Sequence, residues 1–93
     1  MPIMFSPRLV LDVPGASSDA LALALAAVHA LFDALGITPE DAASAHRKLA
    51  NDRVKLSAQD LRAADAWEMA QRVVIESCDA SRLGLAWTMT LTD

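Results

Sequence analysis

Residues 85–92 of the chain, LAWTMTLT, place large apolar side chains at every second position and mostly threonine between them. A period of two is typical of a β-strand with one buried face. Residues 3–13, IMFSPRLVLDV, follow a similar pattern, which is interrupted by Pro7 and by Val10 on the polar side. The sequence therefore predicts a strand near each end, and the two strands can close a small domain by pairing with each other.

Capping residues mark three predicted helices between these strands. Ser17, Ser18 or Asp19 can cap a first helix that runs to about residue 35, where Gly36 is suited to the position after its end. Thr38 followed by Pro39 starts a second helix, which runs to about residue 51. A third helix is predicted from the Ser57 cap, with Asp60 three residues later, to about Cys78, and residues 79–84 form a turn.

The first helix is apolar on nearly every side. Its core face is predicted at helical spacing, by Leu21, Leu25, Val28, Phe32 and Leu35. A second apolar strip lies beside that face, formed by Leu23, Ala27, Ala30 and Ala34. A helix of this kind is usually buried on more than one face. In so small a domain, the second strip predicts a partner surface.

The predicted fold class is α+β, with three helices between two terminal strands that pair in a small antiparallel sheet. Residues 1–93 form a single domain, because a chain of this length is near the lower limit for one core. A sheet of two strands is marginal on its own. We therefore expect either residues 54–56 to join it as a third strand or a second subunit to extend it.

Composition restricts the protein's class and location. An apolar fraction of 54% and a net charge of −4 argue against a disordered chain. One cysteine excludes an intramolecular disulfide and fits a reducing compartment. The longest internal uncharged run, residues 20–32, is shorter than the roughly 20 residues that span a bilayer. It follows acidic residues rather than a basic segment, so we expect a cytoplasmic protein without membrane contact.

No catalytic or metal-binding pattern accompanies the predicted fold. Cys78 would need an activating base, and the sequence places neither His29 nor His46 beside it. His29 and Asp33 share a helix face, but two ligands are too few for a metal site. The three glycines are isolated, so a glycine-rich phosphate loop is excluded. We expect no enzymatic activity, no cofactor and no metal.

A short basic segment stands out in the acidic chain. Residues 46–55 contain four bases and one acid, the bases being Arg47, Lys48, Arg53 and Lys55. Residues 28–47, which overlap the start of this segment, resemble the helix-turn-helix pattern of bacterial regulators, with Gly36 at the turn. Phe32 stands where that pattern has a small residue, and acids open the second helix. The resemblance implies an alternative function as a DNA-binding regulator that contacts phosphates through the four bases.

The function predicted first is that of a small non-enzymatic, cytoplasmic protein-interaction or regulatory module, expected as a homodimer. The predicted contacts are Leu23 and Ala27 on the first helix, and Trp87 and Met89 on the last strand. An inhibitor that occupies another protein's functional surface would show the same features. A protein partner or a second copy is thus expected ahead of nucleic acid.

Overall fold

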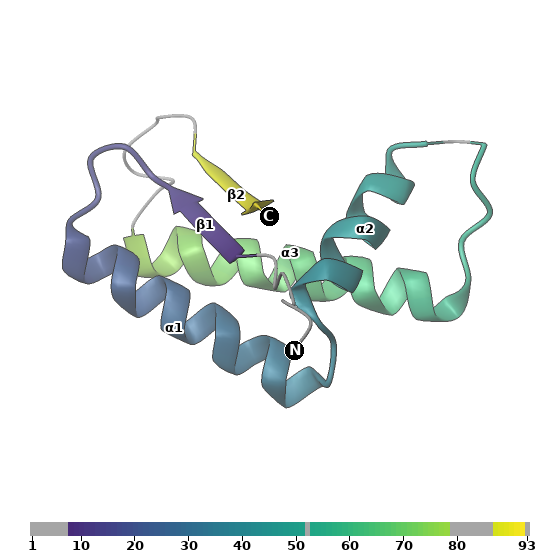
Figure 1. The fold of residues 1–93 in the computed structure, drawn as a ribbon, viewed down its shortest axis with the longest axis horizontal. Coiled ribbons are helices and arrows are strands. Elements are labelled where there is room, and N and C mark those ends of the chain that lie inside the picture. The colour runs from purple at the N-terminus through teal and green to yellow at the C-terminus, as the bar shows by residue number, and fades with distance from the viewer. Residues whose placement is uncertain (1–7, 52, 79–86, 93) are drawn as a thin grey trace, which may run out of the picture.

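The computed structural model describes residues 8–51, 53–78 and 87–92 of the chain. Its elements follow the order β1 (Arg8–Asp12), α1 (Ser18–Leu35), α2 (Pro39–Leu49), α3 (Ala58–Cys78) and β2 (Thr88–Thr92), as Figure 1 shows. The fold is therefore α+β, with three helices between two terminal strands, as predicted. The parts of the predicted strands in residues 3–7 and 85–86, and the predicted turn 79–84, lie outside the described residues.

The two strands pair antiparallel, with Leu9 opposite Leu91 and Leu11 opposite Met89. Leu9 and Met89 are buried, whereas the threonines of β2 are exposed. The alternation seen in the sequence is thus a sheet with one buried face. In the described part of the chain the sheet has two strands.

Residues 54–56 form no strand, so the predicted third strand is wrong. The Val54 N–H donates to the Asn51 carbonyl, and the Asn51 side chain accepts from the Arg53 N–H. These bonds turn the chain after α2 toward the start of α3, on the side of the molecule away from the sheet (Figure 1). The apolar residues there link two helices and do not extend the sheet.

Side-chain caps set the helix ends where the sequence predicts them. Ser17 Oγ accepts from the Ala20 N–H and Thr38 Oγ1 from the Asp41 N–H, both at 3.1 Å. Gly36 ends α1 with a φ of 67°, a left-handed conformation that suits glycine. The second helix ends at Leu49, slightly earlier than predicted, and Ala50 caps it.

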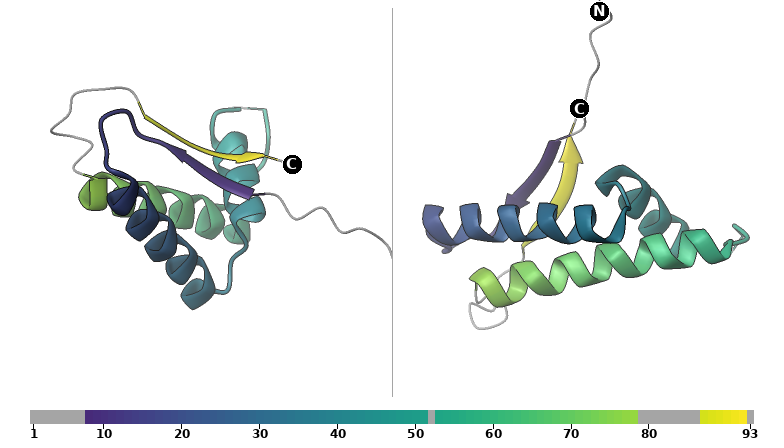
Figure 2. Two further views of the ribbon diagram at one scale, coloured as in Figure 1. Left: turned by 60° about the vertical axis from the view of Figure 1, so that its left-hand side comes forward. Right: turned by 90° about the horizontal axis from the view of Figure 1, so that it is seen from below.

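The longest helix, α3, is the scaffold on which the other elements pack. Both α1 and α2 lie against it, and the sheet covers one side of the helices, with β1 nearest α1 and β2 nearest α2 (Figures 1 and 2). The core combines one face of each helix with the inner face of the sheet. Its larger buried members are Leu9, Val28, Phe32, Trp67, Val74 and Met89.

Candidate functional site

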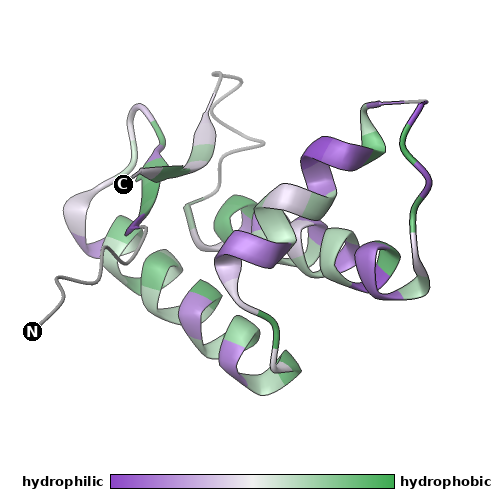
Figure 3. Ribbon diagram, turned by 45° about the vertical axis from the view of Figure 1, so that its right-hand side comes forward, coloured by the Kyte–Doolittle hydropathy of each residue, from purple (hydrophilic) through white to green (hydrophobic). Residues whose placement is uncertain are grey.

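The outward strip of α1, formed by Leu23, Ala27, Ala30 and Ala34, is exposed along its whole length. Leu23 is 70% exposed, the most exposed of the large hydrophobic side chains described. Of the 18 residues of α1, only Ala24, Val28 and Phe32 are fully buried. Figure 3 shows α1 as predominantly hydrophobic, with few hydrophilic positions. The predicted core stripe is confirmed, because Val28 and Phe32 are buried and Leu21, Leu25 and Leu35 are partly buried against the core. The second strip faces solvent.

Polar residues border this strip on one side only. His29 and Asp33 are exposed and lie four residues apart on one side of the helix, and the exposed Asp19 lies one turn before Leu23 at the start of the strip. Among the described residues, no group of three or more histidines, cysteines, aspartates or glutamates could hold a metal ion. These polar residues therefore form a solvent-exposed border beside the apolar strip.

By length and composition alone, α1 is apolar enough to cross a membrane. The core helix of a soluble protein satisfies the same criteria. Asp19 and Asp33 lie within the span, at opposite ends of the helix. Hydropathy alone therefore does not decide what covers the exposed side of α1.

A groove of about 440 Å³ lies where α2, α3 and β2 meet, and we call it the β2 groove. Its lining includes consecutive residues of the last strand region, from Trp87 to Leu91. Successive side chains of a strand point to opposite faces of the sheet. The groove therefore follows β2 along its length, on the side where α2 approaches the strand. Its other wall is formed by Ala43, His46, Arg47, Trp67 and Gln71.

Two rings form the centre of the helical wall. The His46 and Trp67 rings lie with their centroids 6.1 Å apart and tilted by 32°. His46 Nδ1 is buried without a hydrogen-bond partner among the described residues. Arg47 is exposed, Trp87 is half-buried and Met89 is buried. The groove thus combines aromatic and apolar walls with an accessible guanidinium.

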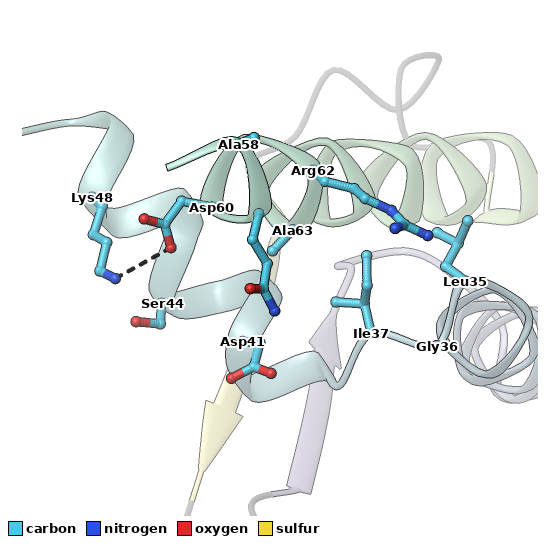
Figure 4. A pocket seen from close by; sticks show the side chains of 11 residues that line it. Leu35, Gly36, Ile37, Asp41, Ser44, Lys48, Ala58, Asp60, Arg62 and Ala63 are labelled. Atoms are coloured by element: carbon cyan, nitrogen blue, oxygen red, sulfur yellow. Dashed lines mark hydrogen bonds and ion pairs between the residues drawn. The ribbon is translucent and has the colours of Figure 1, made fainter. Parts of the chain in front are cut away.

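A second hollow, of about 580 Å³, lies between the α1–α2 turn and the start of α3 (Figure 4). Its acids, Asp41 and Asp60, are matched by its bases, Lys48 and Arg62. Lys48 Nζ lies 3.3 Å from Asp60 Oδ1. The other carboxylate oxygen of Asp60 accepts from the Ser57 N–H at 3.1 Å. The ion pair of Lys48 with Asp60 and the hydrogen bond from Ser57 therefore stabilise the start of α3.

The structure separates the four bases of the predicted nucleic-acid site. Arg47 lines the β2 groove, and Lys48 pairs with Asp60 in the second hollow. Arg53 and Lys55 are exposed in the link between α2 and α3. In addition, α1 and α2 pack mainly on α3 and not on each other. In a helix-turn-helix unit, the two helices joined by the turn pack together.

Cys78 is buried at the end of α3, with Sγ 3.8 Å from the Ala20 carbonyl oxygen in α1. Burial raises the pKa of this thiol. A protonated, enclosed thiol is a poor nucleophile. Cys78 is thus a packed thiol at the end of α3.

Of the predicted protein contacts, Leu23 and Ala27 lie together on the outward strip. Trp87 and Met89 meet in the β2 groove, where Met89 is also part of the core. Sequence reasoning missed that His46 and Arg47 face these two residues. They lie about forty positions earlier in the chain, and the local periodicity of either segment does not reveal their meeting.

No family model, no curated protein and no solved structure matches this chain. Its functional interpretation therefore rests on the outward strip of α1 and on the β2 groove.

Proposed function

We propose that this protein is a small, non-enzymatic protein-interaction module that self-associates through the outward strip of α1. The proposal rests on the exposure of Leu23, whose side chain is 70% exposed at one end of a continuous apolar strip. Removing a leucine side chain from water stabilises a complex by about 1.5–3 kcal/mol. Burial of this face in a complex would therefore provide hydrophobic stabilisation that the monomer lacks.

The spacing of the strip favours another helix as its partner. Its members follow one another at intervals of four, three and four residues, the spacing of the a and d positions of a coiled coil. Small residues allow two helix axes to approach closely. A second helix that carries a similar apolar strip can therefore pack against this one.

A second copy supplies such a helix in a two-fold symmetric, antiparallel arrangement. If the axis passes between Ala27 and Ala30, each Leu23 lies opposite Ala34 of the partner subunit. The large side chain of one helix then meets the small side chain of the other at both ends of the contact. One helix pair is a small interface, so we expect micromolar rather than nanomolar association.

The rest of the molecule is compatible with this proposal. The exposed side chains of His29 and Asp33 keep one side of the contact hydrated. The single cysteine is buried and forms no disulfide, which is compatible with a cytoplasmic location.

Sedimentation velocity at low and high micromolar concentrations tests the proposal with three proteins. The unaltered chain should form a dimer at the higher concentration, whereas Leu23→Asp should stay a monomer with an unchanged circular dichroism spectrum. The matched control is Leu61→Asp, because Leu61 is 49% exposed on α3, outside the strip. This control should dimerise like the unaltered chain. A monomer at every concentration, or a dimer that survives Leu23→Asp, would overturn the proposal.

Two additions separate the competing partners. Phosphatidylcholine vesicles test whether the strip binds lipid. An unaltered chain that stays a monomer and sediments with vesicles, while Leu23→Asp does not, contradicts self-association. Duplex DNA tests the basic residues, and a salt-sensitive gain in mass with DNA would favour the nucleic-acid function instead.

A further inference from the structure

The edge of β2 that borders the groove has no strand beside it in the described part of the chain, since β2 pairs with β1 alone. An edge strand presents unpaired N–H and C=O groups that can bond to another extended chain. The helix α2 stands near this edge, so the edge opens into a groove and not onto a flat surface. An extended segment that lies in the groove would have β2 on one side and helical side chains on the other.

The groove also provides a place for an apolar side chain. Trp67 is buried and Trp87 half-buried, and Met89 and Leu91 belong to the inner face of the sheet. The volume of about 440 Å³ falls within the usual range of ligand sites, about 300–1,000 Å³. It suits a few residues of a peptide and not a folded domain.

The charge of the groove selects among such segments. The described residues that line it include Arg47 and His46 and no acid, although the chain as a whole carries a net charge of −4. Arg47 makes no ion pair with a described residue. A guanidinium beside an apolar groove favours a ligand that carries a carboxylate.

We propose that the β2 groove binds an extended acidic peptide segment, which adds to the free edge of β2 as a third strand. Main-chain hydrogen bonds to β2 hold the segment, an apolar side chain packs against the apolar lining of the groove, and a carboxylate meets Arg47. Such strand addition combines main-chain affinity with side-chain specificity. It also adds a neighbour to a sheet of two strands, which is marginal alone.

Two other occupants fit the groove less well. A second copy would bring its own α2 beside its own β2, so the two helices would obstruct edge-to-edge pairing. Nucleic acid needs several cations along a run of phosphates, whereas Arg47 is the one guanidinium among the described residues of the lining.

The test is a titration of the ¹⁵N-labelled full chain with two acetylated and amidated pentapeptides, Thr-Val-Glu-Val-Thr and Thr-Val-Lys-Val-Thr. The glutamate peptide should shift the amide resonances of residues 87–91 and of His46, and should bind at least about tenfold more tightly than the lysine peptide. No shift in residues 87–91 at millimolar peptide, or equal affinity for the two peptides, would overturn the proposal.

Matched charge reversals locate the carboxylate contact. Arg47→Glu should weaken binding of the glutamate peptide by about tenfold or more and improve that of the lysine peptide. Arg53→Glu makes the same change in net charge at an exposed position outside the lining, and should leave the affinity within about twofold. An equal loss of affinity for the glutamate peptide in both variants would indicate general electrostatic attraction. It would contradict a direct contact between the carboxylate and Arg47.

N-methylation of the peptide tests whether it adds as a strand. Methyl groups on alternate residues block the hydrogen bonds of one edge of an extended chain and leave the other edge free. One of two peptides methylated in alternate positions should therefore lose binding while the other keeps it. Binding by both would show that the peptide fills the groove without joining the sheet. Leu23→Asp should bind the glutamate peptide normally, so a failure of self-association and a failure of this proposal are separate results.

Discussion

Cys78 shows how packing sets the chemistry of a single residue. Its thiol is 6% exposed between α3 and α1, and burial raises its pKa above the ordinary value of 9.0. Because the thiolate is the reactive form, we expect iodoacetamide to alkylate the folded protein very slowly at pH 8. Added denaturant should speed the reaction by orders of magnitude, as mass spectrometry of timed samples would show. Similar rates in the folded and unfolded chain would contradict the burial of this thiol.

The start of α3 depends on a reciprocal cap, which makes the helix sensitive to acid. The Ser57 N–H donates to Asp60 and the Asp60 N–H donates to Ser57 Oγ, both at 3.1 Å. The hydrogen bond from the Ser57 N–H, more than the nearby Lys48, lowers the pKa of Asp60 below its ordinary value of 3.8. A lowered pKa stabilises the fold fully above that ordinary value, and the contribution is lost as the pH falls toward the folded-state pKa.

Asp60→Asn should therefore destabilise the protein at pH 7 and have a smaller effect at pH 3, below the ordinary carboxyl pKa of 3.8. Urea unfolding of both proteins at the two pH values measures this difference. Asp65→Asn is the control, because Asp65 is exposed on the same helix and makes no hydrogen bond with a described residue. A pH-independent effect of Asp60→Asn would mean that the carboxylate charge contributes nothing to the cap.

At the scale of the elements, local chemistry could be predicted from the sequence and long-range pairing could not. Ser17, Thr38 and Ser57 cap the three helices as predicted, since a cap is a bond between residues three positions apart. Residues 54–56 have the composition of a strand but lie on the side of the molecule away from the sheet, so pairing was never available to them. The β2 groove forms because α2 approaches β2, a contact between segments far apart in the sequence. The sequence therefore shows Arg47 only as a member of a basic segment and not as part of a groove.

Small side chains make up much of the core of the molecule. Ala24, Ala42 and Ala70 are completely buried, as are Val28 and Val74, and the larger Phe32 and Trp67 are 2% and 4% exposed. Alanine removes little apolar surface from water on folding, so the monomer gains less hydrophobic stabilisation than its apolar fraction of 54% suggests. A small domain of this kind gains proportionally more from an interface than a large one does.

Because association stabilises the folded state by mass action, the proposed dimer makes thermal stability depend on concentration. We expect the melting temperature of the unaltered chain to rise by several degrees between samples about a hundredfold apart in concentration. Leu23→Asp should melt at one temperature in both samples, close to that of the dilute unaltered chain, because Leu23 contributes little to the monomer core. Circular dichroism in cells of different path length measures all four samples. If the melting temperature of Leu23→Asp also rises with concentration, the chain associates through another surface. If the melting temperature of the unaltered chain does not change with concentration, the proposed dimer does not form and the alanine-rich core stabilises the fold without it.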